Sequence, residues 1–199
     1  MQAENTGFVF PGQGSQKTGM LTELANSCSE VKDTFAEASE VLGYDLWQLI
    51  QSGAEGELSK THITQPAILT ASFAIWTVWV SRGGAEPRIM AGHSLGEYSA
   101  LTCAGAIAFA DAVALVKKRG EYMQAAVPLG IGGMAAIVGL EDDKVIEACN
   151  QARQGEEVSA VNFNSPGQVV IAGHIDAVNR AGELCKEAGA RRALPLPVS

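Results

Sequence analysis

Five consecutive residues, Gly92-His93-Ser94-Leu95-Gly96, have the types and spacing needed for covalent chemistry. They fit the pattern G-x-S-x-G, in which a strand turns into a helix so sharply that the serine backbone is strained and the residues two positions away must be small. The turn exposes the serine hydroxyl at the N-terminus of a helix, where peptide dipoles favour negative charge. The pattern predicts that Ser94 is a nucleophile. The alternative is a glycine-rich junction whose serine only caps the helix.

The elements predicted around this motif favour the first interpretation. Residues 88–91 form an apolar run typical of a strand, and a helical pattern follows over 94–105. Another short apolar run, over 8–10, leads into a Gly-rich loop over 11–19. Pro66 in a first turn predicts a helix that starts at Thr64. The predicted helices cover residues 20–41, with a break near 26–29, and residues 44–51, 64–80 and 109–126.

The pattern changes after a predicted linker over 128–133. Strands are predicted over 134–138, 158–163, 168–172 and 191–194, and helices over 142–149 and 175–187. This βαββαβ order is the ferredoxin-like arrangement. We therefore expect an α/β fold: an α/β-hydrolase-like large subdomain over 1–130, an inserted ferredoxin-like subdomain over 131–195, and the start of a return to the large subdomain over 196–199.

Bulk composition excludes several classes of function. The net charge of −8 over 199 residues argues against nucleic acid as a partner. The cysteines are too far apart for a metal site or a CxxC motif, which suits reduced thiols. Residues 1–5 carry no basic region and no apolar region follows them, so we expect no signal peptide. The apolar stretch over 68–80 is too short to span a membrane, so we expect a cytoplasmic protein without a membrane partner.

Longer motifs carry a resemblance to a known family. Phe8-Val9-Phe10-Pro11-Gly12-Gln13-Gly14-Ser15-Gln16 and Gly92-His93-Ser94-Leu95-Gly96-Glu97-Tyr98 resemble the malonyl-CoA:acyl carrier protein transacylases of bacterial type II fatty acid synthesis. Thr64-Gln65-Pro66-Ala67 and the run from Asn162 to Gln168 are similar to the same family. The acyltransferase domains of polyketide synthases share much of this pattern and are the nearest alternative.

The resemblance implies a two-step transfer through a covalent intermediate. Ser94 would take the malonyl group from malonyl-CoA as an ester, and the phosphopantetheine thiol of acyl carrier protein would then accept it. The backbone N–H groups of Leu95 and Gln13 would form the oxyanion hole, and no metal or other cofactor is implied. A phosphate-binding loop is excluded, because Lys17 lacks the required G-K-[ST] spacing.

The resemblance also assigns substrate-binding residues. Arg119 would grip the malonyl carboxylate, since a guanidinium makes two parallel bonds to a carboxylate; the alternative is an ordinary cation near a helix end. Gln65 and Met123 would line the acyl pocket. Three more residues would face the pantetheine or carrier side of a cleft between the subdomains: Asn162, Asn164 and Gln168. Without the resemblance, the ordinary interpretation of all five of these positions is a turn or packing role.

A serine nucleophile needs a base, and none of the three histidines suits this role. His93 adjoins Ser94 but should point to the other side of the turn. His62 is expected at the surface before a helix, and His174 at a helix start. In the family, the base lies on a segment that continues the run 194–199, so the histidine is expected just beyond Ser199. We therefore expect an incomplete large subdomain, little activity and a tendency to associate.

Two other classes of function remain open at this point. A serine hydrolase or thioesterase shares the G-x-S-x-G motif but would prefer water as the acceptor and leave Arg119 without a purpose. A non-catalytic module that binds acyl carrier protein needs only a local basic patch, because carrier proteins are usually acidic. Candidates for such a patch are Lys17, Lys117, Lys118, Arg191 and Arg192.

Overall fold

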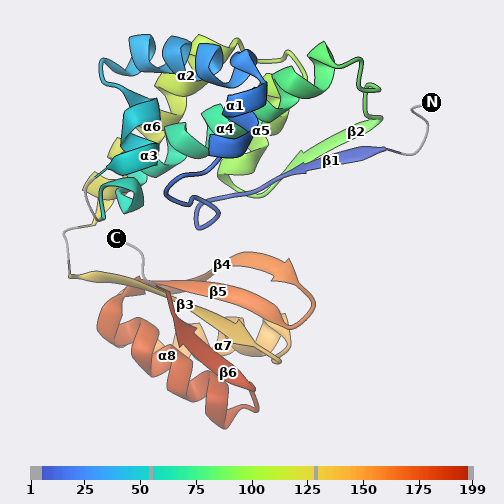
Figure 1. The fold of residues 1–199 in the computed structure, drawn as a ribbon. Coiled ribbons are helices and arrows are strands. Elements are labelled where there is room, and N and C mark those ends of the chain that lie inside the picture. Colours follow the sequence, from blue (N-terminus) through green and yellow to red (C-terminus); the bar gives the residue numbers. More distant parts are fainter. Residues whose placement is uncertain (1–5, 54–55, 128–129, 197–199) are drawn as a thin grey trace. The chain divides into compact units, whose positions relative to one another are not determined.

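The chain divides into two compact units, Met1–Gln124 and Ala125–Ser199 (Figure 1). The computed structural model describes residues 6–53, 56–127 and 130–196. Residues 128–129 of the expected linker and 197–199 of the expected return segment lie outside the described residues. The elements of the first unit are β1 (Gly7–Phe10), α1 (Thr22–Ser27), α2 (Ser29–Leu42), α3 (Leu46–Ser52), the 3-10 helix η1 (Glu57–Ser59), α4 (Thr61–Ser81), β2 (Ile89–Gly92), α5 (Leu95–Cys103) and α6 (Phe109–Ala126).

Strands β1 and β2 form a parallel two-stranded sheet, in which Phe10 pairs with Gly92 (Figure 1). One face is apolar and covered by helices: the ring of Phe8 lies 5.5 Å from that of Trp76 in α4. The other face is open, and Val9 is 85% exposed. The pairing brings the loops that follow the two strands to the same edge, as parallel strands require.

Helix α2 buries one stripe, which includes Val31, Phe35 and Leu42, against α4. This spacing is the amphipathic pattern of a surface helix. The helix ends at Gly43, which has a φ of 78° and closes the last turn. The predicted break in this region is confirmed, because Cys28 adopts an extended conformation between α1 and α2.

Helix α4 starts at Thr61, three residues before the predicted start at Thr64. The Lys60 carbonyl accepts bonds from two amides of the first turn, and the Thr64 hydroxyl bonds the Leu58 carbonyl, which anchors this earlier start. Pro66 therefore lies inside the helix. By length and composition α4 could cross a membrane, but 67% of its apolar window is buried inside the protein, as in a core helix.

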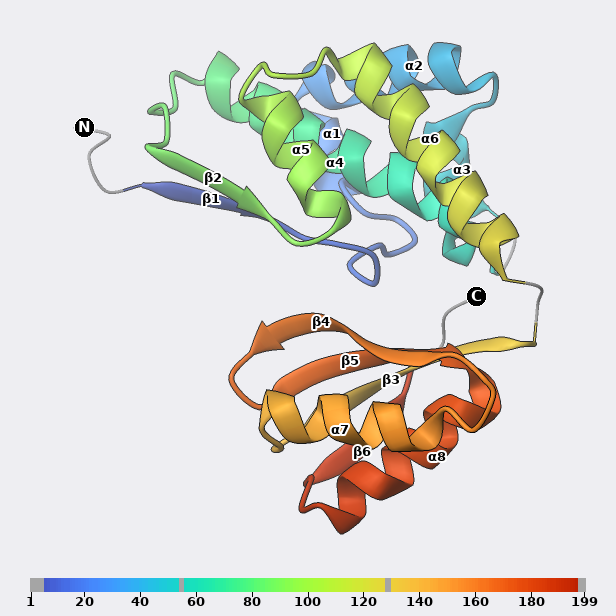
Figure 2. The ribbon, with the colours of Figure 1, turned by 180° about the vertical axis from the view of Figure 1, so that it is seen from behind.

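The second unit contains β3 (Gly132–Val138), α7 (Asp142–Ala152), β4 (Val158–Ser165), β5 (Gln168–His174), α8 (Ile175–Glu187) and β6 (Arg192–Pro195). Its strands form one antiparallel sheet in the order β4-β5-β3-β6. Helices α7 and α8 cover one face of this sheet (Figure 2). Val169 and Ile171 point into the core beneath them, while the alternate residues of β5 line the other face.

Candidate active site

Ser94 occupies a strained turn between β2 and α5. Its backbone has φ 53° and ψ −107°, a conformation that costs a non-glycine residue about 1–3 kcal/mol. A Cβ on Gly92 would collide with the backbone of Gly96, and a Cβ on Gly96 would collide with the carbonyl of Phe10. The predicted need for small residues on both sides is confirmed. The turn leaves Ser94 exposed at the first turn of α5.

The loop after β1 packs directly against this turn. The His93 amide donates to the Phe10 carbonyl at 3.2 Å. A Cβ on Gly12 would lie 2.8 Å from the His93 carbonyl oxygen, so only glycine allows this approach. The nucleophile turn and the loop that carries Gln13 are therefore held together by backbone atoms.

The two predicted donors of the oxyanion hole, the amides of Leu95 and Gln13, belong to the two segments that meet at this turn. Leu95 follows the serine, and Gln13 follows the glycine that touches the turn. Among the residues that the structure describes, neither amide donates to a protein acceptor. The Gln13 side chain donates from Nε2 to Thr61 Oγ1 at 3.3 Å and so ties this loop to the start of α4.

Arg119 of α6 reaches the hydroxyl of Ser94. Its Nη2 donates to Ser94 Oγ at 3.1 Å, and its Nη1 donates to Gln65 Oε1 at 2.7 Å. Gln65 is fully buried in α4 and donates in turn from Nε2 to Met123 Sδ at 3.2 Å. The structure thus brings together Ser94, Arg119, Gln65 and Met123, four residues that sequence analysis had selected.

Arg119 keeps donors for a ligand. A guanidinium has five N–H groups, and the two bonds to Gln65 and Ser94 occupy two of them. Within the part of the chain that the structure describes, one N–H on each Nη and the Nε–H remain available. Such a fork matches the two oxygens of a carboxylate, so the site can bind an acyl group with a free carboxylate beside the serine.

A close crossing of α4 and α6 sets the distance between Gln65 and Arg119. A Cβ on Gly120 would lie 2.6 Å from the Cα of His62. Only a residue without a side chain lets the helices approach this far. His62 therefore lies in the first turn of α4 and against α6, so its predicted surface position before the helix is wrong. The earlier start of α4 is the reason.

The other two histidines are placed as follows. The His93 ring lies beside Gly12, since a Cβ there would be 3.1 Å from His93 Nδ1. His174 precedes α8 in the second unit, as predicted, and its Nδ1 accepts from the Glu157 amide at 3.0 Å. Neither arrangement identifies a base for Ser94.

The remaining candidates belong to the second unit. Asn162 of β4 pairs with Val170 of β5, and Gln168 lies two residues before Val170 on the same strand. Both polar residues therefore lie on the sheet face opposite the helices. Asn164 is exposed at a register shift of β4. Their predicted role stays a prediction.

Two residues that touch the site were not selected from the sequence. Thr61 is buried and bonds the Gln13 side chain. Tyr98 lies on α5, and its ring centroid is 5.6 Å from the Arg119 guanidinium carbon. The sequence held no local signal for Tyr98, because its contact with Arg119 joins α5 to α6.

The cysteines do not offer a second nucleophile in this structure. All four are free and buried. Burial raises the pKa of Cys103 to about 12 and that of Cys185 to about 11, and it also raises the pKa of Cys149. A thiol with such a pKa stays protonated near neutral pH and reacts poorly. Among the described residues no group of three or more His, Cys, Asp or Glu side chains could hold a metal ion.

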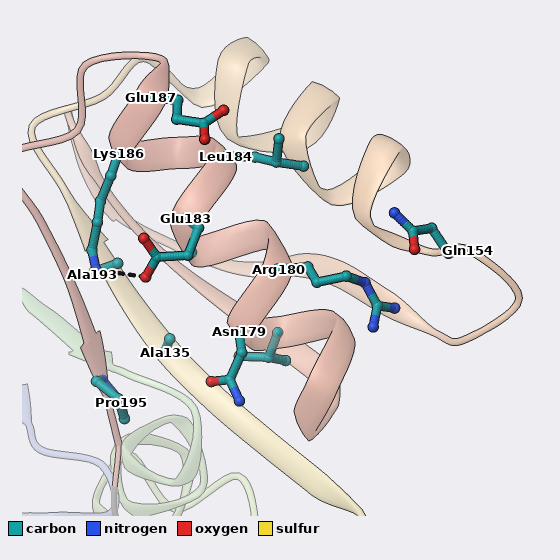
Figure 3. A pocket seen from close by; sticks show the side chains of 12 residues that line it. Ala135, Gln154, Asn179, Arg180, Glu183, Leu184, Lys186, Glu187, Ala193 and Pro195 are labelled. Atoms are coloured by element: carbon teal, nitrogen blue, oxygen red, sulfur yellow. Dashed lines mark hydrogen bonds and ion pairs between the residues drawn. The ribbon is translucent and has the colours of Figure 1, made fainter.

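A cavity of about 560 Å³ lies in the second unit, along α8 (Figure 3). Arg180 on its wall donates to the Ala152 carbonyl at the end of α7 and to Glu156. Lys186 pairs with Glu183 on the same helix at 2.8 Å. These charged side chains already bond the end of α7 or one another. The packing of the unit therefore accounts for this cavity.

Comparison with known proteins gives one consistent result. The acyl transferase domain family matches residues 7–196. The malonyl CoA-acyl carrier protein transacylase of Salmonella typhimurium is 65% identical over 192 residues, which are 96% of this chain and 62% of that protein. The chain thus spans about 62% of the length of the curated relatives it matches.

Solved structures agree with this result. An acyl carrier protein S-malonyltransferase from Vibrio cholerae is 65% identical, with a TM-score of 0.93 over 97% of this chain and 63% of that one. A malonyl-transacylase solved in complex with a type II polyketide acyl-carrier protein is 62% identical, with a TM-score of 0.94 over 97% and 62% of the two chains. This chain therefore belongs to the acyl transferase domain family.

Proposed function

We propose that this chain carries the nucleophile and the substrate arginine of an enzyme that moves a malonyl group from malonyl-CoA to the phosphopantetheine thiol of acyl carrier protein. The observation that carries the proposal is the bond from Arg119 Nη2 to Ser94 Oγ, on a serine held at φ 53°. This bond between a guanidinium and an exposed serine supports a carboxylate-binding role for Arg119 and a nucleophilic role for Ser94. The names of the relatives specify the same donor and acceptor.

In the first step, Ser94 Oγ would attack the thioester carbonyl while a base takes the hydroxyl proton. The developing oxyanion would accept bonds from the amides of Leu95 and Gln13, and the carboxylate would bind the free N–H groups of Arg119. The C–S bond then breaks, CoA leaves as a thiol after protonation, and a malonyl ester remains on Ser94. The carrier thiol reverses these events and restores the serine.

Specificity would come from Arg119 with its partner Gln65. The buried amide of Gln65 fixes one end of the guanidinium, and the other end faces the nucleophile. A malonyl carboxylate satisfies the available donors, whereas an acetyl group leaves them without a partner. Met123, the sulfur partner of Gln65, would border the acyl group. In the second unit, Asn162, Asn164 and Gln168 would contact the pantetheine arm.

The general base would be a histidine outside these 199 residues. The placements of His62, His93 and His174 support this proposal, as does the greater length of the relatives. We accordingly propose an incomplete α/β-hydrolase-like subdomain joined to a ferredoxin-like one, with little activity from the chain by itself. The enzyme would be cytoplasmic and need no cofactor beyond the phosphopantetheine of its partner.

The experiment compares the 199-residue chain with a C-terminally extended one. Both are given malonyl-CoA with and without carrier protein, and the ester on Ser94 is detected by mass spectrometry. We expect carrier-dependent transfer by the extended chain and at most residual transfer by the shorter one. Equal rates would refute the missing base, and hydrolysis that ignores carrier protein would indicate a hydrolase.

A polyketide pathway is the second candidate, because one similar structure holds a type II polyketide carrier protein. The two pathways share the chemistry and differ in the carrier. Transfer rates to carrier proteins of both pathways, measured with the same extended chain, decide between them.

A further inference from the structure

We propose that Tyr98 is a positioning residue that sets the preference for acyl groups bearing a carboxylate. The inference rests on the proposed function and concerns how the Arg119 guanidinium is held. Its carbon lies 5.6 Å from the centroid of the Tyr98 ring, within the range in which a cation is attracted to an aromatic face.

The position of Tyr98 follows from the position of the nucleophile. Tyr98 lies in the first turn of α5, which begins directly after Ser94, and its ring reaches the guanidinium that bonds Ser94 Oγ. The start of α5 at the strained turn therefore sets where the ring lies. Tyr98 is half-buried and packs against the main apolar core of the first unit, which limits its movement.

The ring supplies a restraint that hydrogen bonds alone do not. The bond to Gln65 fixes one nitrogen of Arg119, but the guanidinium plane could still turn about that point. The bond to Ser94 must weaken when the serine reacts. The ring of Tyr98 contacts the cation itself, and this contact lasts through the reaction. It thus keeps the remaining N–H groups aimed at the carboxylate.

The same protein provides a control for this contact. On α6, Lys118 lies over the ring of Tyr122, also at 5.6 Å from the ring centroid. Tyr122 is 64% exposed, and its cation is Lys118, which makes no bond to Ser94 or Gln65. A change at Tyr122 removes an equivalent cation–aromatic contact without touching Arg119.

The test uses the variants Tyr98→Leu, Tyr98→Phe and Tyr122→Leu of the full-length protein that the gene encodes. For each variant kcat/KM is measured with malonyl-CoA and with acetyl-CoA, and malonate binding is measured by calorimetry. We expect Tyr98→Leu to lose about 5- to 30-fold with malonyl-CoA, the factor that corresponds to a cation–aromatic contact of 1–2 kcal/mol. The loss should fall mainly on KM, and the acetyl rate should change by less than about twofold.

The controls separate positioning from general damage. Tyr98→Phe keeps the ring and should keep the malonyl-to-acetyl ratio, and Tyr122→Leu should leave it unchanged. Equal losses with both donors in Tyr98→Leu, or an unchanged ratio, overturn the inference. If the unaltered protein transfers no malonyl group, the proposed function fails instead. Malonate binding that is equally strong in Tyr98→Leu and in the unaltered protein also overturns the inference.

Discussion

The interiors of the two units differ in polarity. Among the described residues, every buried polar side chain lies in the first unit, including Gln65, Thr61 and Ser99. Within the described part of the first unit, three buried hydroxyls have no hydrogen-bond partner: those of Tyr44, Thr70 and Ser99. The core of the second unit is built from aliphatic residues and cysteines. Unpaired buried polar groups cost stability, so the interior of the first unit carries a cost that the described core of the second unit does not.

The largest difference between the units should appear at their strained residues. Ser94→Gly removes the nucleophile and should reduce malonyl transfer by at least about 10³-fold. Gln154→Gly relaxes the strained residue of the second unit, at φ 45°, and should leave transfer intact. Each change should raise the unfolding free energy by at most about 1 kcal/mol, measured in urea. Transfer that survives in Ser94→Gly would exclude Ser94 as the nucleophile.

Arginines give the next comparison. Arg119→Ala should lose about 10- to 150-fold with malonyl-CoA, because bonds to charged groups contribute about 1.5–3 kcal/mol, and far less with acetyl-CoA. Arg180→Ala leaves the end of α7 without its partner and should lower thermal stability with the donor ratio unchanged. The readout is kcat/KM for both donors. Equal loss with both donors in Arg119→Ala would contradict the assignment.

Two helical glycines give a smaller effect. Gly120→Ala should lower the unfolding free energy by about 1–3 kcal/mol and weaken malonyl preference, because its methyl meets the backbone of His62. Gly182→Ala in α8 would bring its methyl 3.4 Å from that of Ala193, which is an ordinary van der Waals contact. It should therefore be neutral or stabilising by up to about 1 kcal/mol. A Gly120→Ala protein with unchanged stability would refute the close crossing.

The units should behave most alike at high pH. Burial raises the pKa of Cys103 to about 12 and of Cys185 to about 11. The unfolded chain loses these thiol protons at a lower pH than the folded chain does. The contribution of the buried thiols to the free energy of unfolding is therefore complete below a pH of about 8.5, and it declines as the pH rises toward the pKa values of the folded state. Urea unfolding at pH 8 and pH 10 measures this decline. Cys103→Ala and Cys185→Ala should each reduce it, and a decline that neither variant alters would refute the cause.

Local pattern predicted much of this structure, and contacts between distant segments account for the rest. The turn at Ser94, the break near Cys28 and the helix over 175–187 depend on neighbours in the sequence. The start of α4 was missed, because it depends on bonds to the preceding η1 segment. Of the site, Ser94 and Arg119 were selected with the help of a family resemblance; the structure brings them into contact, and their roles stay predictions. Tyr98 and Thr61 were not, since their contacts depend on how α4, α5 and α6 cross.

The meeting of three backbones at Gly92, Gly96 and Phe10 has a consequence for redesign. No larger residue fits at either glycine, so the frame around the nucleophile cannot be varied by protein engineering. Beside Ser94 stands a chain of side chains from α4 and α6, in which Arg119 bonds Gln65 and Gln65 bonds Met123. A library that seeks new acyl groups should therefore leave Gly92 and Gly96 untouched and vary Gln65 and Met123.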